Sequence, residues 1–354
     1  MSDVNEQIAA VEKELRELPH HKATDHHIGR LRAKLARLKE REIEAGSRKG
    51  GGGGGYSVKK QGDATVVLIG PPSAGKSTLI NLLTNAQSRV APYAFTTVSV
   101  IPGMMEYKSA RIQILDVPGL IEGAEEGKGR GREVLSVARG ADLLLIMSDP
   151  KRTAAIGRII DALEKNGIRI NKTPPLVDIE KKMGGGLAIH SNLKQDLDNE
   201  TIKEIAQEFG LKNGEITIKE KLNMERAIDA FSANRVYTPA LFVLNKADTV
   251  KSKKENYIYI SAQSEMGIQS LLEEIWQRLN FIRVYLVKRE EEPNYDNPMI
   301  MRQDQTLKDV AEKIGSEFAQ LHSKAKIWAS GSKFPGQEVS MAAQVVDGMQ
   351  IRFL

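Results

Sequence analysis

The sequence is poor in several features that would mark particular classes of protein. It has no cysteine, which excludes disulfides and thiolate metal sites. Aromatic residues make up only 5% of the chain, which argues against recognition of single-stranded nucleic acid mainly by base stacking. No apolar run approaches the ~18 residues of a membrane span, and the polar residues 1–10 lack the apolar core of a signal peptide. We therefore expect a cytoplasmic protein that does not bind membranes.

A large surplus of charge of one sign is also missing. The 354 residues carry a formal net charge of +5, with a pI near 9.1. So small a surplus over so long a chain predicts that any surface for polyanions is local. At this length, two or three domains can each bury a core of their own.

Residues 1–60 are expected to form a helical domain that ends in a glycine-rich linker, Gly50–Gly55. Apolar residues recur at helical spacing on both sides of Pro19–Asp25, which predicts a helical hairpin with its turn there. The second helix presents either a solvated face or an RNA-contacting face through six cations: Arg30, Arg32, Lys34, Arg37, Lys39 and Arg41. Four histidines near the turn form either a metal site or a polar turn: His20, His21, His26 and His27.

From Thr65 onward the pattern is that of an α/β protein with a largely parallel sheet covered on both faces. The expected strands are Thr65–Ile69, Arg111–Leu115, Asp142–Met147, Pro239–Leu244 and Tyr257–Ile260. A small α+β domain follows from about Ile282. It is expected to contain strands at Ile282–Val287, Pro298–Met301, Lys326–Ala329 and Gln350–Leu354, and one amphipathic helix over Leu307–Leu321.

A phosphate-binding motif, G-x-x-x-x-G-K-[ST], lies between the first strand and the helical run Thr78–Thr84. Its glycines let the backbone turn tightly, so that N–H groups converge on phosphate oxygens at a helix N-terminus. Lys76 would neutralise the β- and γ-phosphates, and the Ser77 hydroxyl would bind Mg²⁺. The expected binding residues are Gly70, Pro71, Pro72, Ser73, Ala74, Gly75, Lys76, Ser77 and Thr78.

A second motif, Asp116-Val-Pro-Gly119, ends another strand 39 positions after Ser77. The Asp116 carboxylate can reach Mg²⁺ there, and the Gly119 N–H can meet a γ-phosphate. Between the two motifs, Thr96 and Thr97 offer hydroxyls that could complete the Mg²⁺ shell only when the γ-phosphate is present, and Thr97 is the favoured one. We therefore expect Ser77, Thr97 and Asp116 to hold the metal and Lys76, Thr97 and Gly119 to act in catalysis.

A third motif, Asn245-Lys246-Ala247-Asp248, follows strand Pro239–Leu244 and indicates the base. The Asp248 carboxylate can accept bonds from N1–H and the 2-amino group of guanine, a donor pair that adenine lacks. After one more strand, backbone N–H groups of Ser261, Ala262 and Gln263 could contact the guanine oxygen. In this order the motifs predict GTP and GDP rather than ATP as the nucleotide.

Residue 120, directly after the second motif, is leucine, where many GTPases carry a glutamine that orients the attacking water. We therefore expect slow intrinsic hydrolysis, organised by backbone groups, by a monovalent cation or by a residue that a partner supplies. A second hypothesis is an RNA- or ribosome-binding module in which the nucleotide only gates docking.

Five segments together resemble those of the Obg-like GTPases: Gly70–Ser77, Tyr93–Thr97, Asp116–Ala124, Gly127–Gly131 and Asn245–Asp248. Three further segments resemble those of one branch of this group, the developmentally regulated GTP-binding proteins (DRG) and their archaeal relatives. These segments are His21–Thr24, Ile28–Leu38 and the glycine run Gly50–Gly55. The resemblance covers essentially the whole chain.

The resemblance implies a GTPase domain over 61–281, interrupted at 165–236 by an α/β insertion similar to a ribosomal-protein domain. It also implies a C-terminal TGS domain of β-grasp form over 282–354. The 129 positions between Asp116 and Asn245 agree with such an interruption. The expected partners are the ribosome or RNA and a protein that stimulates hydrolysis, with no DNA partner, and the expected state is a monomer. Potassium is a further candidate ion, although cation-dependent relatives have asparagine in place of Ser73.

Overall fold

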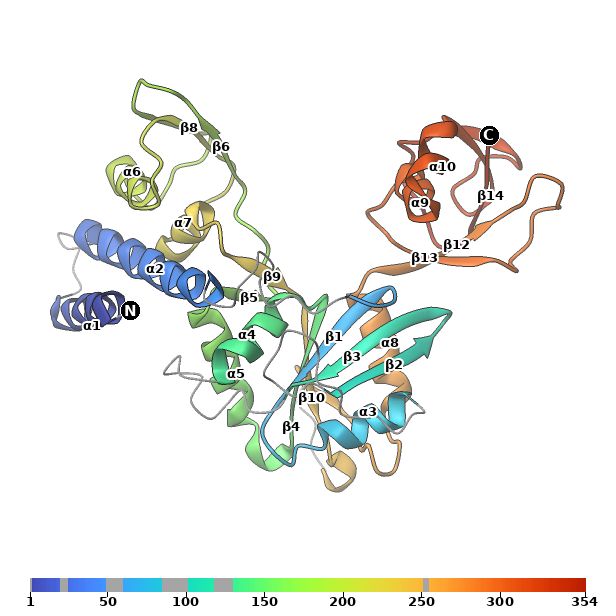
Figure 1. The fold of residues 1–354 in the computed structure, drawn as a ribbon, viewed down its shortest axis with the longest axis horizontal. Helices are drawn as coiled ribbons and strands as arrows, with labels where there is room; N and C mark the ends of the chain where they lie inside the picture. The colour runs from blue at the N-terminus through green and yellow to red at the C-terminus, as the bar shows by residue number, and fades with distance from the viewer. Residues whose placement is uncertain (1, 20–24, 49–59, 85–100, 118–129, 251–254) are drawn as a thin grey trace. The chain divides into compact units, whose positions relative to one another are not determined.

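The structure is a computed structural model that describes residues 2–19, 25–48, 60–84, 101–117, 130–250 and 255–354 (Figure 1). The chain divides into two compact units, each made of segments that are far apart in the sequence. Unit 1 contains Met1–Ser57 and Ala162–Thr238, and unit 2 contains Val58–Asp161 and Pro239–Leu354.

Unit 2 is built around a six-stranded sheet with the order β11-β10-β4-β1-β3-β2. Its strands are β1 (Ala64–Ile69), β2 (Ile101–Tyr107), β3 (Ala110–Asp116), β4 (Leu143–Ser148), β10 (Ala240–Leu244) and β11 (Ile258–Tyr259). All neighbours run parallel except β2, which is antiparallel to β3. Every residue of β1 and β4 is buried, as continuous apolar strands require in a sheet that is covered on both faces.

Helices cover both faces of this sheet. Helices α3 (Lys76–Thr84) and α8 (Ile268–Arg278) lie on one side, and α4 (Arg130–Arg139) and α5 (Ala154–Lys165) lie on the other (Figure 1). Leu79 of α3 and Leu271 of α8 join the same buried cluster as Val66 and Leu145 of the sheet. The predicted α/β class is therefore confirmed.

The edge strand β2 was not predicted. Its sequence contains Pro102 and Gly103, which lower strand propensity and interrupt the apolar pattern. Both residues are tolerated because β2 lies at the edge, where it pairs with β3 alone.

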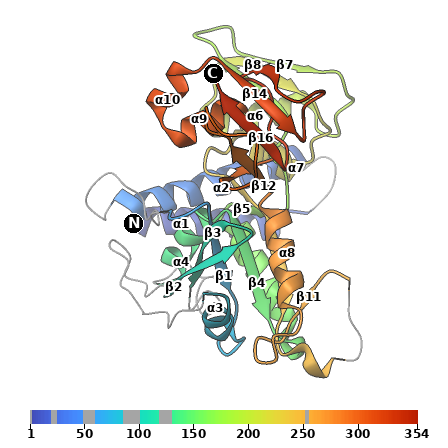
Figure 2. The ribbon, with the colours of Figure 1, turned by 90° about the vertical axis from the view of Figure 1, so that its right-hand side faces the viewer.

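The C-terminal part of unit 2 is β-rich, with a five-stranded mixed sheet in the order β13-β12-β16-β14-β15. The strands are β12 (Phe281–Leu286), β13 (Pro298–Arg302), β14 (Lys324–Ala329), β15 (Gln337–Ser340) and β16 (Met349–Phe353). Helix α9 (Leu307–Ile314) packs Leu307 and Val310 against Val284 and Ile351 of this sheet (Figure 2).

The prediction of one helix over Leu307–Leu321 was wrong. Helix α9 ends at Gly315, whose extended backbone starts a second helix, α10 (Ser316–Leu321). Glycine has one of the lowest helix propensities, and the Gly315 N–H still satisfies the Ala311 carbonyl at the end of α9.

Unit 1 contains the predicted helical hairpin, α1 (Ser2–Glu17) and α2 (Asp25–Arg48). The rest of the unit holds a parallel pair, β5 (Ile168–Ile170) and β9 (Val236–Thr238), and a three-stranded sheet in the order β6-β8-β7. Its remaining elements are β6 (Val177–Lys181), β7 (Leu187–Ser191), α6 (Asn199–Glu208), β8 (Gly214–Ile218) and α7 (Met224–Phe231).

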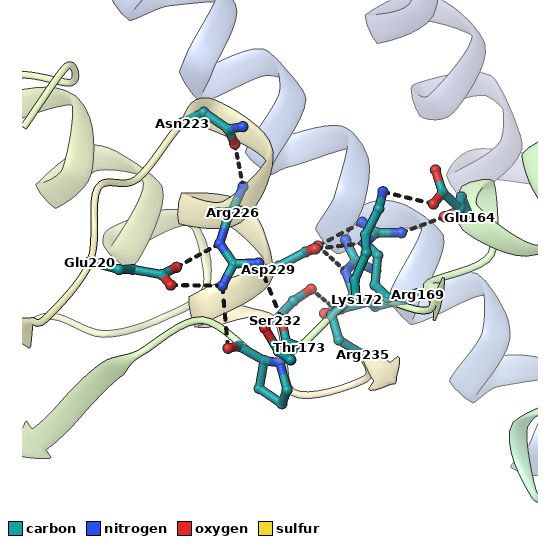
Figure 3. Close-up of polar contacts among 12 residues, drawn as sticks. Glu164, Arg169, Lys172, Thr173, Glu220, Asn223, Arg226, Asp229, Ser232 and Arg235 are labelled. Carbon is teal, nitrogen blue, oxygen red and sulfur yellow. Dashed lines mark hydrogen bonds and ion pairs between the residues drawn. The ribbon is translucent and has the colours of Figure 1, made fainter. Parts of the chain in front are cut away.

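A network of charged side chains ties α7 to the pair β5–β9 (Figure 3). The Asp229 side chain is only 8% exposed and accepts hydrogen bonds from Arg169 at 2.6 Å and from Arg235 at 2.6 Å. Burial disfavours the charged guanidinium, but the hydrogen bonds and charge of Asp229 outweigh burial and raise the pKa of Arg169. A second pair, Arg226 with Glu220, lies beside it.

We predict that Asp229→Ala lowers the free energy of unfolding by about 3–5 kcal/mol, because it leaves two buried guanidinium groups without their carboxylate. Urea unfolding followed by circular dichroism measures the change. The control is Asp178→Ala, which removes the partner of Lys219 from an exposed ion pair and should cost less than about 1 kcal/mol. Equal losses in the two variants would contradict the buried network as a stabilising feature.

Candidate functional site

The described motif residues lie at one edge of the six-stranded sheet. Residues 70–75 follow β1, Asp116 ends β3, Asn245 follows β10 and Ser261 follows β11. Because these four strands are parallel, their carboxyl ends share an edge. That edge is where α/β sheets bind their ligands.

The loop from Gly70 to Gly75 has no room for side chains at its two glycines. A Cβ atom on Gly70 would lie 2.2 Å from the Met147 carbonyl oxygen, and one on Gly75 would lie 2.2 Å from Asn245 Nδ2. Gly75 also has φ +90°, a conformation that other residues rarely adopt. The sequence motif therefore reflects close backbone approach to neighbouring strand ends.

Lys76 begins α3 and is held inside this loop. Its Nζ donates to the carbonyl oxygens of Gly70 at 3.1 Å and Pro71 at 3.3 Å and lies 4.0 Å from Asp116 Oδ1. Burial lowers the pKa of Lys76, and the nearby charge of Asp116 only partly opposes burial. A bound anion would favour the charged ammonium, so the position suits a phosphate.

Asp116 and Ser77 form the candidate metal pair. Ser77 Oγ donates to Asp116 Oδ2 at 3.0 Å, whereas Oδ1 of the same carboxylate is buried and has no hydrogen-bond partner among the residues that the structure describes. Burial raises the pKa of Asp116 despite the opposing charge of Lys76. A buried carboxylate oxygen without a partner beside a hydroxyl is a pair of hard oxygen donors, which fits Mg²⁺.

Asn245 joins three loops of the site. Its side-chain Nδ2 donates to the Ala74 carbonyl at 2.9 Å, and its Oδ1 accepts from the Ala262 N–H at 2.9 Å. The next residue, Lys246, reaches the Ser73 carbonyl with its Nζ at 2.9 Å. The phosphate loop, the end of β10 and the segment after β11 are therefore fixed to one another.

The residues expected to read the base lie beside this junction. Asp248 lies in a short 3₁₀ turn, η2 (Ala247–Thr249), which is anchored by the bond from Ala247 N–H to the Ile260 carbonyl. Asp248 and Gln263 are exposed, whereas Ser261 and Ala262 are buried. The exposed carboxylate is thus available to a ligand.

Some of the expected residues cannot be placed. Thr96, Thr97, Gly119 and Leu120 lie outside the described residues. Thr78, in the first turn of α3, is exposed. The roles expected for these residues stay predictions.

Arg152 is a charged neighbour of the phosphate loop that the sequence reading missed. Its Nη1 donates to the Pro72 carbonyl at 3.1 Å, and its guanidinium pairs with Asp149, the residue after β4. Its charge also contributes to the lowered pKa of Lys76. The available signal was the segment Asp149–Arg152, which follows a buried strand at the same edge of the sheet.

The histidine turn gives no further support for a metal site. His26 lies 3.4 Å from Glu204 and His27 lies 3.0 Å from Glu14, while His20 and His21 fall outside the described residues. Across the described ranges, no three His, Asp or Glu side chains are grouped closely enough to hold a metal ion. Those ranges also contain no helix that is both long and apolar enough to span a bilayer.

Comparison with known proteins identifies the family. Residues 65–181 match the family described as 50S ribosome-binding GTPase, and residues 184–281 match the C-terminal region of that domain. The chain is 44% identical to an uncharacterized GTP-binding protein of Methanocaldococcus jannaschii, over 98% of this chain and 91% of the relative.

The similarity extends to eukaryotes. The chain is 39% identical to developmentally-regulated GTP-binding protein 1 of Xenopus laevis, over 96% of this chain and 95% of that protein. It is 36% identical to developmentally-regulated GTP-binding protein 2 of Homo sapiens, over 95% of each. The chain is therefore a GTP-binding protein that belongs to the DRG family of Obg-like GTPases.

Proposed function

We propose that this protein is a slow GTPase switch that uses Mg²⁺ and acts on the ribosome. The observation that best supports this proposal is the meeting of the motif residues at one sheet edge, where Asn245 bonds to the phosphate loop and to Ala262, and Ser77 bonds to Asp116. The family implies GTP binding and hydrolysis, and the finer roles below are proposed for individual residues.

Phosphate and metal binding are assigned to the loop and the end of β3. Backbone N–H groups of residues 70–77 and the Lys76 ammonium bind the phosphates. Ser77 and Asp116 would hold Mg²⁺, with Thr97 completing the set in the GTP state. The ion would neutralise charge on the β- and γ-phosphate oxygens.

Selectivity for guanine is assigned to Asp248. Its exposed carboxylate stands beside the buried segment Ser261–Ala262, whose N–H groups are proposed to contact the guanine oxygen. Asn245 contributes by holding the two segments in register with the phosphate loop.

Switching is assigned to the two segments that contain Thr97 and Gly119, which would contact the γ-phosphate and change when it leaves. With Leu120 in place of a water-orienting glutamine, chemistry depends on backbone groups or on a residue from a partner. A ribosomal partner is supported by the family's description and by the cationic helix α2.

A binding module in which nucleotide only gates docking is the second candidate. It is favoured by the same cationic helix, which lies in unit 1, whereas the nucleotide motifs lie in unit 2. The two proposals differ in whether hydrolysis of GTP is required for the function on the ribosome.

We predict that Asp248→Asn weakens GTP binding by about 100-fold or more, because the amide cannot accept both guanine donors. It should gain affinity for xanthosine triphosphate, whose 2-oxo group can accept from the amide. Competition against a fluorescent guanine nucleotide measures both affinities. Asp296→Asn, at an exposed position in the C-terminal region, is the matched control. Unchanged selectivity in Asp248→Asn would overturn the guanine assignment.

We predict slow single-turnover hydrolysis, on the order of 10⁻³ s⁻¹ or below, because no glutamine follows Gly119. Since Ser73 replaces the asparagine of cation-dependent relatives, the rates in potassium and in sodium should agree within about twofold. Phosphate release from preloaded protein measures both rates. Strong acceleration by potassium would contradict this prediction and show that the cation takes over a catalytic role that glutamine has in other GTPases.

Co-sedimentation with native ribosomes tests the switch itself. Wild type should pellet with a non-hydrolysable GTP analogue and less with GDP. Lys76→Ala should lose this difference, because removing a charge-assisted phosphate contact weakens nucleotide binding by about 10- to 100-fold. Thr97→Ala should bind nucleotide but also lose the difference, because the γ-phosphate no longer orders the segment.

The control for this experiment is Lys333→Ala, an exposed lysine in the C-terminal region. If both site variants pellet as wild type does with every nucleotide, the switch proposal fails and ribosome binding is independent of the GTPase cycle.

A further inference from the structure

The positive charge of the protein is concentrated in the middle of helix α2. Residues 30–41 contain six lysines or arginines and one glutamate, a net charge of +5. The whole chain also has a net charge of +5, so the other 342 residues balance, with 45 cations and 45 carboxylates. A chain that is otherwise neutral therefore has its whole surplus on a few turns of one helix.

Two faces of α2 are occupied by packing within unit 1. Leu31 and Leu38 pack on α1 together with Val11. On another face, Ala33 joins the buried cluster of α6, β8 and α7. Gly29 lies so close to α7 that a Cβ atom would come within 2.8 Å of the Met224 methyl group. Helix α2 is thus held between α1 and the pair α6–α7 (Figure 1).

A third face carries what we call the cationic stripe: Arg30, Lys34, Arg37 and Arg41. At 3.6 residues per turn, these four positions fall within an arc of about 60° and extend over about 16 Å of helix. Three of the four are exposed and Arg37 is half-buried. The other two cations of the segment, Arg32 and Lys39, lie on the opposite side by the same geometry.

The charge of the stripe is not neutralised within the described residues. No carboxylate there forms an ion pair with any of its four cations, and Arg30 contacts only His27 Nδ1 at 3.3 Å. Three acids in the described part of unit 1 are engaged elsewhere: Glu12 pairs with Lys39, Glu14 with His27, and Glu40 with the Ser232 hydroxyl.

We propose that the cationic stripe of α2 is a docking surface for an RNA phosphate backbone. Three of its four residues are arginines, whose guanidinium groups bind phosphate oxygens in pairs. Neighbours at i, i+3 and i+4 stand about 5–6 Å apart, so several cations can reach one strand of phosphates together. The stripe has no aromatic residue, so recognition is of the backbone and independent of sequence.

An anionic membrane is a poorer fit. A helix that lies on a membrane needs an exposed apolar face beside its cations. Leu31, Ala33 and Leu38 of α2 are buried against α1 and α6–α7, and Leu35 and Ala36 are half-buried against the same neighbours. The proposal rests on the ribosomal association proposed above only for the source of the RNA, because the chemistry of the stripe is independent of it.

The experiment uses the full chain with four substitutions, Arg30→Ala, Lys34→Ala, Arg37→Ala and Arg41→Ala, which keep helix propensity high. The probe is a fluorescent RNA stem-loop of arbitrary sequence, titrated between 50 and 200 mM KCl. Loss of four phosphate contacts should reduce the slope of log K against log[KCl] by about 3 and weaken binding at least about tenfold at low salt.

The matched control removes four exposed lysines from the same unit: Lys194, Lys212, Lys219 and Lys221, each changed to alanine. This variant loses the same formal charge but should keep the wild-type salt slope within about one unit. Both variants should keep wild-type GDP affinity and a cooperative thermal transition, which separates loss of RNA binding from loss of fold.

An unchanged slope in the stripe variant would overturn the proposal, as would equal losses in both variants, because binding would then be diffuse. Competition by polyglutamate as strong as that by RNA of equal charge would instead assign the stripe to an acidic protein. The ribosomal proposal is judged separately. If the stripe binds the stem-loop but wild type does not pellet with ribosomes, the stripe proposal stands and the ribosomal association fails.

Discussion

The hydrogen bonds of the buried Asn245 amide are the interactions on which the proposed nucleotide site depends. One side chain satisfies the Ala74 carbonyl and the Ala262 N–H, groups that lie 171 and 17 positions away in the sequence. Buried backbone groups are costly when unsatisfied, so this amide fixes the geometry of two loops at once. It also sets the limit on residue 75, because its Nδ2 fills the space that a Cβ would need. Gly75 of the first motif and Asn245 of the third motif therefore depend on each other: the asparagine amide fits only because residue 75 has no side chain.

The sheet explains why the second segment of unit 1, Ala162–Thr238, can be inserted without disturbing this junction. The chain leaves unit 2 within α5 and returns directly into β10, the strand that Asn245 follows. The entry and exit of the insertion are paired as neighbouring strands, Ile168 with Val236. Arg169 and Arg235, which follow and precede these positions, share the carboxylate of Asp229. The two ends of the insertion are therefore held together by contacts within the insertion. The register of β10 is set by its pairing with β4.

Local sequence patterns were sufficient to predict elements that carry a strong local signal. They were insufficient where the structure depends on contacts between residues that are distant in the sequence. The apolar runs of β1 and β4 were predicted correctly, because burial on both faces leaves a strong signal, and a strand, a loop and a helix surround Lys76 as the motif predicted. Strand β2 was missed because Pro102 and Gly103 interrupt its apolar pattern and have low strand propensity. The helix break at Gly315 was missed because the apolar pattern continues through it. Arg152 and Asp229 belong to no motif, and their partners follow only from the fold.

Helix α2 shows how one segment can satisfy three demands at once. Its leucines meet α1, its small residues meet α6 and α7, and the four cations of the stripe occupy a third arc. Small residues are needed where α7 comes close, as at Gly29, and long polar side chains are excluded there. Because packing on two sides already orders the backbone, a polyanion that binds the third side meets a fixed array of charges. Less conformational entropy is then lost on binding than with a flexible basic tail. The same separation of faces means that the charge of the helix can vary without affecting its packing.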